Sequence, residues 1–376
     1  MTGARPVAIF DATPLALGER TGVARFAREL FERLARDRSG PLDWIVAAPR
    51  PIPGGPEALA AGDGRLSPFS WRRTALRRLA EERSAAALFS PFAAIPFGRL
   101  ACPAIATVHD VPWARRGEIP KEDVSFRKRL SLGYTASRAA RIVVPSEATR
   151  RDLVSLFPRA AAKTRVVPLG VSAAFRAAPL PPEERRRARR RLSIPDGPFL
   201  LALGALRARK NPGFLLDVLA AGHFGAHERL SLVVTGEGSV DPDALRERAT
   251  ERGLAGRAVF TGHVSDPDLA TLLDEALAVA VPSAIEGFSL PAAEAMARGT
   301  PVLASERGAL PEVVGDAGFV LPHGEAAPWA AAVRTLLAEP GRRDALGAKG
   351  RARAAAFDWD ATAREVAALV AEAAFP

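Results

Sequence analysis

Short apolar runs alternate with amphipathic segments along most of the chain. In one such segment, Phe26, Leu30 and Leu34 recur at the spacing of a single helical face. Apolar runs of strand length occur at 7–10, 44–48, 87–89, 104–108, 141–146, 199–204, 230–235, 259–264, 276–281 and 302–305. Because strands that alternate with helices form parallel sheets covered by helices, we expect an α/β fold.

The chain is long enough for two domains. At 376 residues it exceeds the size at which one hydrophobic core usually keeps growing. The pattern is interrupted at 173–198, a segment rich in Pro and Arg. We therefore expect a first domain at 1–172, a second at 173–356, and a final segment, 357–376, that holds the last predicted helix.

The composition is typical of a soluble globular protein, with 48% hydrophobic and 25% charged residues. No apolar run approaches the roughly 20 residues that a membrane-spanning helix needs. The first residues lead directly into the predicted strand at 7–10. We expect a cytoplasmic protein.

The net charge of +10 favours an anionic partner, which could be nucleic acid, a membrane surface or a phosphorylated substrate. The arginine-rich segment 183–191 has no accompanying aromatic or base-reading motif, so we interpret it as a solvated helix and expect no nucleic acid partner. The basic segments 71–80 and 121–129 leave two interpretations open. They form either a solvated face over Leu76 and Leu79 or a contact with an anionic membrane.

The densest candidate chemistry lies at 282–302. Glu286 and Gly287 fall in a turn after a predicted strand, and Ser289 is placed to cap the following helix, which carries Glu294. Backbone N–H groups from Gly287 to Leu290 and the positive helix end would suit a phosphate or diphosphate. The two carboxylates would then hold hydroxyl groups.

Two further clusters follow predicted strand ends. Arg207, Arg209 and Lys210 lie in the loop after the first strand of the second domain, where positive charge would suit a diphosphate leaving group. His109 follows the strand at 104–108, at the edge where open α/β sheets bind ligands.

Paired aspartates are the only metal-like pattern in the sequence. They occur at 241/243, 266/268 and 358/360, each at the start of a predicted helix. We interpret them as helix caps, and we expect neither a metal nor a cofactor.

Several segments resemble one enzyme family over nearly the whole chain. They read E-G-F-S-L-P-x-x-E-A-M-A-x-G-x-P-V from Glu286, R-T-G-V-A-R-F around Gly22, T-V-H-D around His109, and R-K-N from Arg209. This set resembles retaining glycosyltransferases of family 4 (glycosyl transferases group 1), especially mannosyltransferase-like members. The resemblance implies the GT-B fold, in which two Rossmann-like domains face each other across a cleft and the C-terminal helix returns to the first domain.

The resemblance also implies roles for individual residues. Those assigned to catalysis are His109, Arg209, Lys210 and Glu286. Those assigned to donor binding are Gly22, Arg207, Gly236, Val264, Gly287, Phe288, Ser289, Leu290 and Glu294. Many family members carry Arg where this chain has Ala205, so the choice between Arg207 and Arg209 as the diphosphate ligand stays open.

The implied reaction moves a hexose, with mannose favoured, from a GDP-sugar or UDP-sugar to a hydroxyl of a glycan or lipid-linked acceptor in surface polysaccharide or glycoconjugate synthesis. The implied location is cytoplasmic, with a peripheral contact to the membrane face. Two alternatives remain: a sugar-nucleotide epimerase of GT-B shape, and a non-catalytic protein that binds nucleotides or nucleic acid.

Overall fold

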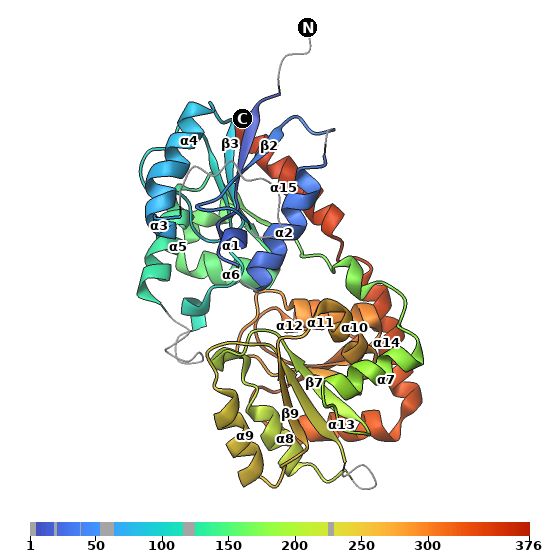
Figure 1. Ribbon diagram of the computed structural model, residues 1–376. Helices are drawn as coiled ribbons and strands as arrows, with labels where there is room; N and C mark the ends of the chain where they lie inside the picture. Colours follow the sequence, from blue (N-terminus) through green and yellow to red (C-terminus); the bar gives the residue numbers. More distant parts are fainter. Residues whose placement is uncertain (1–4, 19–20, 38, 53–63, 116–124, 225–228) are drawn as a thin grey trace. The chain divides into compact units, whose positions relative to one another are not determined.

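The computed structural model describes residues 5–18, 21–37, 39–52, 64–115, 125–224 and 229–376 (Figure 1). Lys121, part of the predicted basic segment 121–129, lies outside these residues. The chain forms two compact units. The first comprises the described residues up to Arg115, those from 125 to Gly170, and Asp358–Pro376. The second comprises Val171–Phe357.

The first unit is built on a parallel sheet with the strand order β2-β1-β3-β4-β5-β6. Its strands are β1 (Val7–Asp11), β2 (Asp43–Ala47), β3 (Ala87–Ser90), β4 (Ala104–Thr107), β5 (Arg141–Val144) and β6 (Thr164–Val166). β3 and β4 are buried along their whole length, as strands covered on both faces should be. The predicted α/β class is therefore confirmed for this half.

The helices of the first unit include an uninterrupted helical run at 68–82 with a π-helical middle. Trp71, Leu76 and Leu79 are its buried side, while Arg73 and Arg78 are exposed, so the predicted apolar face is buried. The helical segments are α1 (Thr13–Ala16), α2 (Gly22–Leu34), α3 (Pro68–Trp71), η1 (Arg72–Leu76), α4 (Arg77–Glu82), η2 (Pro112–Arg115), α5 (Phe126–Arg138), α6 (Glu147–Leu156), η4 (Pro158–Lys163) and α15 (Trp359–Ala374).

The second unit contains a parallel sheet with the order β12-β11-β10-β7-β8-β9. Its strands are β7 (Phe199–Leu203), β8 (Ser231–Thr235), β9 (Ala258–Gly262), β10 (Ala278–Val281), β11 (Val302–Ser305) and β12 (Gly318–Leu321). From β7 the chain passes to β8 and then to the outermost strand β9. It then returns to the other side of β7, where β10 pairs with it. β7 and β10 therefore flank the topological switch point, where doubly wound sheets bind ligands.

The helical segments of the second unit are η5 (Ala173–Phe175), α7 (Pro182–Arg191), η6 (Ala208–Lys210), α8 (Phe214–Ala221), α9 (Pro242–Glu251), α10 (Asp266–Glu275), α11 (Leu290–Arg298), α12 (Leu310–Val314), α13 (Ala326–Ala338) and α14 (Pro340–Ala354). Trp329 of α13 is fully buried and meets Phe214 of α8 edge-on at 5.4 Å. This pair belongs to the main apolar core of the unit.

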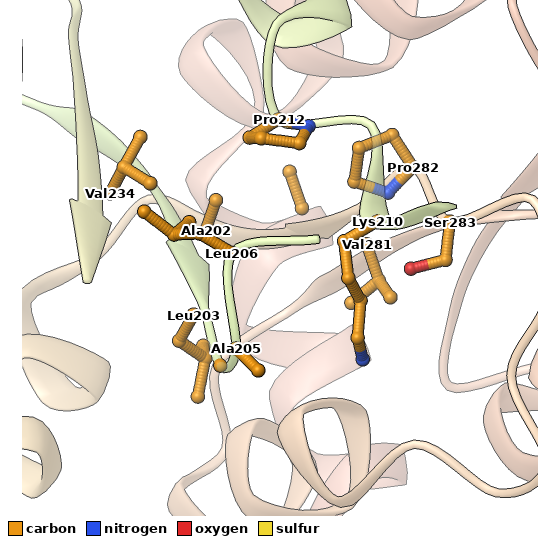
Figure 2. Close-up of a pocket in the computed structure, with 12 residues that line it drawn as sticks. Ala202, Leu203, Ala205, Leu206, Lys210, Pro212, Val234, Val281, Pro282 and Ser283 are labelled. Carbon is orange, nitrogen blue, oxygen red and sulfur yellow. The ribbon is translucent and has the colours of Figure 1, made fainter. Parts of the chain in front are cut away.

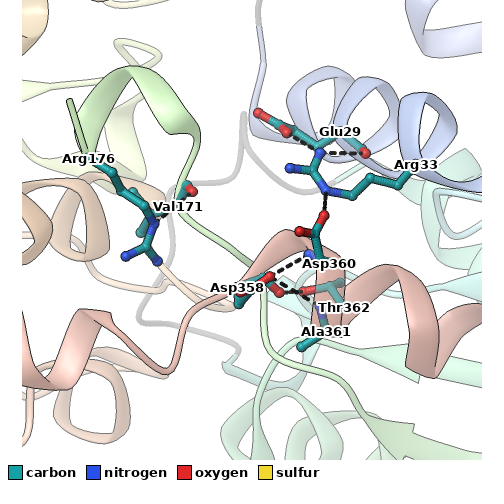
Figure 3. Close-up of polar contacts among 8 residues, drawn as sticks. All are labelled: Glu29, Arg33, Val171, Arg176, Asp358, Asp360, Ala361 and Thr362. Atoms are coloured by element: carbon teal, nitrogen blue, oxygen red, sulfur yellow. Dashed lines mark hydrogen bonds and ion pairs between the residues drawn. The ribbon is translucent and has the colours of Figure 1, made fainter. Parts of the chain in front are cut away.

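The C-terminal helix α15 packs within the first unit, beside α2, β3 and β5 (Figure 1). Asp358 caps it by accepting hydrogen bonds from the backbone N–H groups of Asp360 and Ala361. Arg33 of α2 pairs with both Asp360 and Glu29, at 2.5 and 2.6 Å (Figure 3). The tie is reinforced at Trp359, which lies against Gly170 so closely that no side chain fits there.

We predict that Gly170→Ala destabilises the protein by about 3 kcal/mol, because the new Cβ would lie only 2.5 Å from Trp359 Cγ and the surrounding core would have to shift. Urea unfolding measures the loss. The matched control is Gly341→Ala, in α14, where a Cβ meets nothing within 4 Å and the midpoint should stay within experimental error or rise slightly. Equal midpoints for the two variants would contradict the packing of α15 described above.

Candidate functional site

A buried ion pair lies at the switch point of the second unit. Lys210 Nζ, in η6 after β7, contacts Glu286 Oε1 in the loop after β10. Ser283 Oγ donates to the same carboxylate oxygen at 2.8 Å. The side chain of Glu286 is only 7% exposed and that of Lys210 19%, so the two charges depend on each other. Two residues that the sequence assigns to catalysis are thus brought together.

The loop that carries Glu286 is held through its backbone. Arg209 Nη1 donates to the Ile285 carbonyl at 3.2 Å, and Ala284 N donates to the Arg209 carbonyl at 2.8 Å. On the other side, Ala309 N donates to the Glu286 carbonyl at 2.8 Å. Gly308 has a φ of +59°, and a Cβ there would lie 2.7 Å from Glu286 N. Only glycine suits that position.

Sequence reasoning missed both Ser283 and Gly308 as parts of this site. Ser283 lies three residues before Glu286, within the segment already recognised as important. Gly308 is distant in sequence, and its close approach to Glu286 is visible only in the folded chain.

Ser289 occupies the N-cap position of α11, as predicted, but its side chain makes no capping hydrogen bond. Its backbone is left-handed, with φ 87° and ψ 78°, whereas capping side chains extend from the β region. Its Oγ is buried without a hydrogen-bond partner. A buried hydroxyl in this state, directly before the positive end of a helix, is suited to a ligand that brings its own acceptor oxygen.

The remaining predicted donor residues of this segment are also buried. Glu294 lies on α11 and is 3% exposed. The Phe288 ring packs edge-on against Phe357 at 5.1 Å, so its side chain belongs to an apolar contact. Only its backbone remains for the predicted phosphate contact.

The candidate cations in the loop after β7 have different surroundings. Arg207 is exposed, whereas Arg209 contacts the loop that carries Glu286. Lys210 and Ser283 line a small pocket together with Gly204, Ala205 and neighbouring residues (Figure 2). Its volume of about 20 Å³ admits one water molecule but not a sugar nucleotide. A ligand of that size would have to lie along the open edge of the loops.

Two other predicted donor residues lie near this edge of the sheet. Gly236 follows β8, and its N–H donates to the Gly262 carbonyl at 2.7 Å. Val264 is buried between β9 and α10.

The candidates of the first unit gather at the carboxyl edge of its own sheet. His109 follows β4, and its Nε2 is 2.8 Å from the Pro91 carbonyl, which can only accept. Its ring meets Phe26 of α2 edge-on at 4.9 Å. Burial lowers the pKa of His109 below its usual value, so the neutral ring presents Nδ1 as an acceptor. Gly22 is the first residue of α2, next to the capping Thr21.

Asp11, at the end of β1, is a buried polar residue that sequence reasoning missed. It is fully buried, and its Oδ1 accepts from Thr13 N and Oγ1 at 3.1 and 2.5 Å. Its Oδ2 has no hydrogen-bond partner. Burial raises the pKa of Asp11 above its usual value, partly offset by the charge of Arg72. The acidic residue that directly follows the apolar run 7–10 is the sequence feature that could have indicated this site.

Within the described ranges, no three His, Cys, Asp or Glu side chains are grouped so that they could hold a metal ion. The paired aspartates have mixed roles. Asp241 and Asp358 cap α9 and α15 through their side chains, as predicted. At α10 the cap is Ser265, which accepts from Asp268 N, so the prediction of an aspartate cap there is wrong.

Comparison with known proteins places the chain in a family. Residues 20–175 match the model of Glycosyltransferase Family 4, and residues 184–353 match that of Glycosyl transferases group 1. A D-inositol 3-phosphate glycosyltransferase of Actinosynnema mirum is 30% identical over 287 residues, which cover 73% of this chain and 68% of that protein. The chain belongs to glycosyltransferase family 4.

Another D-inositol 3-phosphate glycosyltransferase, from Kineococcus radiotolerans, is 36% identical to this family-4 chain over 281 residues. The match covers 69% of this chain and 64% of that relative. The chain thus spans slightly less than two thirds of the length of the first curated relatives that it matches.

Solved structures of related shape confirm the GT-B fold of this family-4 chain. Sucrose-phosphate synthase from Thermosynechococcus elongatus has a TM-score of 0.77 at 22% identity and covers 98% of this chain and 99% of its own. WaaG, a glycosyltransferase of lipopolysaccharide biosynthesis, has a TM-score of 0.75 at 15% identity, with 97% and 99% covered. The structure of Anabaena HepE in complex with UDP-glucose has a TM-score of 0.75 at 19% identity and covers 97% of this chain and 99% of its own.

We predict that Lys210→Met and Glu286→Gln each lower the free energy of unfolding by about 2 to 3 kcal/mol, because each leaves its partner charged in a largely buried position. In the double variant both charges are absent, so most of that loss should be recovered. A double-mutant cycle in urea measures the coupling. Strictly additive losses would show that the two side chains do not interact.

Proposed function

We propose that this chain is a retaining hexosyltransferase, which moves a hexose from a nucleotide-diphosphate sugar to an acceptor hydroxyl. Its family membership supports glycosyl transfer in general. The observation that carries the proposal is the Lys210–Glu286 pair at the switch point, with the buried, unpartnered hydroxyl of Ser289 at the start of α11. Together they offer positive charge, hydroxyl-binding carboxylate and a phosphate-binding helix end at one edge of a sheet.

In the proposed complex, Arg209 and Lys210 neutralise the diphosphate, assisted by the backbone at Gly287–Leu290. Glu286 accepts hydrogen bonds from the sugar hydroxyls, and Glu294 binds the ribose. Lys210 already lies against Glu286, so a diphosphate oxygen bound by Lys210 would place the attached sugar close to that carboxylate.

The proposed reaction retains the anomeric configuration. The bond from the anomeric carbon to the leaving phosphate oxygen breaks, and the acceptor oxygen bonds to the same face of that carbon. The acceptor proton passes to the departing phosphate oxygen, so no separate general base is required. Charge that develops on the diphosphate is stabilised by the fixed cations Arg209 and Lys210.

The proposed role of the first unit is to bind the sugar and the acceptor. His109, neutral and with Nδ1 available as an acceptor, would receive a hydrogen bond from a hydroxyl of the transferred sugar. Gly22, at the start of α2, would allow the acceptor and the donor phosphates to approach the backbone.

The donor and acceptor are the finer parts of the proposal. R-K-N at Arg209 and T-V-H-D around His109 favour mannose from a GDP-sugar, whereas the HepE structure, which contains UDP-glucose, makes a UDP-sugar the second candidate. The acceptor is a hydroxyl of a glycan or a lipid-linked glycan. A phosphorylated inositol is a further candidate, because relatives are named for it and because the chain carries a net charge of +10.

We also propose a peripheral contact with the anionic cytoplasmic face of a membrane. Phe126 and Leu130 of α5 are 72% and 56% exposed, on one helical face, and Arg127–Arg129 between them are also exposed. Phe69 of α3 is 51% exposed and joins this surface through Phe97, which stacks on Tyr134 of α5. Exposed aromatic and basic side chains together suit a membrane interface.

The described part of the chain contains no helix with the length and hydropathy needed to cross a bilayer.

A donor panel tests the transferase proposal. GDP-mannose and UDP-hexoses are incubated with glycan, lipid-linked and inositol phosphate acceptors, and release of the nucleoside diphosphate is measured. We expect one donor to turn over and Glu286→Ala to lower kcat about 100-fold or more. Glu251→Gln, an exposed glutamate in α9, is the matched control and should be fully active. An epimerase would convert the sugar without releasing nucleotide, and a binding protein would do neither.

A vesicle assay tests the membrane contact. The double substitution Phe126→Ser with Leu130→Ser should lower binding to vesicles that contain anionic lipid about tenfold, because both exposed apolar side chains are lost. Phe375→Ser removes a 50%-exposed phenylalanine elsewhere in the same unit and should leave binding unchanged. If binding did not change with the anionic lipid content of the vesicles, the membrane proposal would be wrong, and the transferase proposal would be unaffected.

A further inference from the structure

A second polar cavity lies in the second unit, at the opposite edge of the sheet from Glu286. Its volume is about 500 Å³. Asp274 in α10 and Arg298 at the end of α11 line it, just before β10 and β11 begin. Glu286 comes after β10 ends. In a parallel sheet all strand starts share one edge, so β10, about 13 Å long, separates the cavity from the proposed donor site.

The cavity carries excess positive charge. Four arginines and two aspartates line it: Arg185, Arg298, Arg343, Arg351, Asp274 and Asp344. One aspartate is already neutralised, because Arg298 binds Asp274 through Nε and Nη2 at 2.7 and 2.5 Å, with side chains only 4% and 8% exposed. Among the other charged lining residues, three arginines face one aspartate, Asp344, so the lining carries net positive charge.

These arginines come from different elements and are directed by backbone contacts. Arg343 of α14 donates from Nη2 to the Ala276 carbonyl at 3.1 Å. Arg351, about two turns further along α14, lies against the backbone of Gly299. Arg298 also donates to the Ala177 carbonyl. Convergence of guanidinium groups from α7, α11 and α14 on one concavity is a geometry suited to a compact anion.

Arg185, from α7, lines the cavity together with arginines of α11 and α14. A phosphate bound there would balance the excess positive charge of these side chains.

We propose that this cavity binds a phosphate monoester or inorganic phosphate, at a site separate from the donor site. The volume of this partly open cavity suits a small phosphorylated metabolite. The site goes beyond the proposed transfer reaction and does not depend on it.

Calorimetric titration of the full chain with inorganic phosphate and with a hexose 6-phosphate tests the proposal, with sodium chloride at matched ionic strength as the blank. We expect saturable binding of at least one of the two. Arg185→Gln and Arg351→Gln should each weaken it about tenfold or more, because each removes a charged hydrogen-bond donor. Arg187→Gln, on the same helix as Arg185 but with a 68%-exposed side chain, should leave it unchanged.

Two outcomes would overturn the proposal. One is equal weakening of binding by Arg187→Gln, and the other is the absence of saturable binding at 10 mM of the probe, about the weakest site worth proposing. Arg351 is exposed, so Arg351→Gln should fold normally. This variant still tests the proposal if Arg185→Gln fails to fold.

Discussion

The ion pair between Lys210 and Glu286 is the interaction on which the proposed donor site depends. The strand order makes it possible: β7 and β10 are neighbours in the sheet although about 75 residues separate them in sequence, and both loops leave the same edge. Neither charge is stable alone in this largely buried position. The backbone contacts of Arg209 and Ala309 with this loop therefore hold a charged group in place, and a ligand can exploit it without first ordering the site.

α11 connects this edge to the rest of the unit. Its first residues follow the left-handed Ser289, whose buried hydroxyl has no partner, and its last residue, Arg298, is paired with Asp274 at the other edge. The start of this short helix is thus the positive end of its dipole, whereas its last turn is the negative end, so the proposed anion site beside that turn relies on the arginine side chains.

Local pattern was sufficient for much of the fold, because buried parallel strands are continuous apolar runs. β11 was predicted with its observed bounds. β12 was missed because it is an edge strand of four residues, with Val320 exposed. Ser289 was predicted as a side-chain cap because backbone handedness is invisible in sequence. The tight contacts of Gly170 with Trp359 and Gly308 with Glu286 join distant segments, so no local pattern could reveal them. The roles of His109, Glu286 and Glu294 stay predictions.

Titration of UDP and GDP into the wild type, Lys210→Met and Arg207→Met measures most directly whether the diphosphate binds beside Lys210. We predict that one nucleotide binds the wild type and that Lys210→Met weakens it about tenfold or more, because a charged contact to the diphosphate is lost. Arg207→Met should have little effect, because the Arg207 side chain is exposed and the proposed complex uses Arg209 and Lys210 for the diphosphate instead. Equal affinities for wild type and Lys210→Met would contradict the assignment of the donor site.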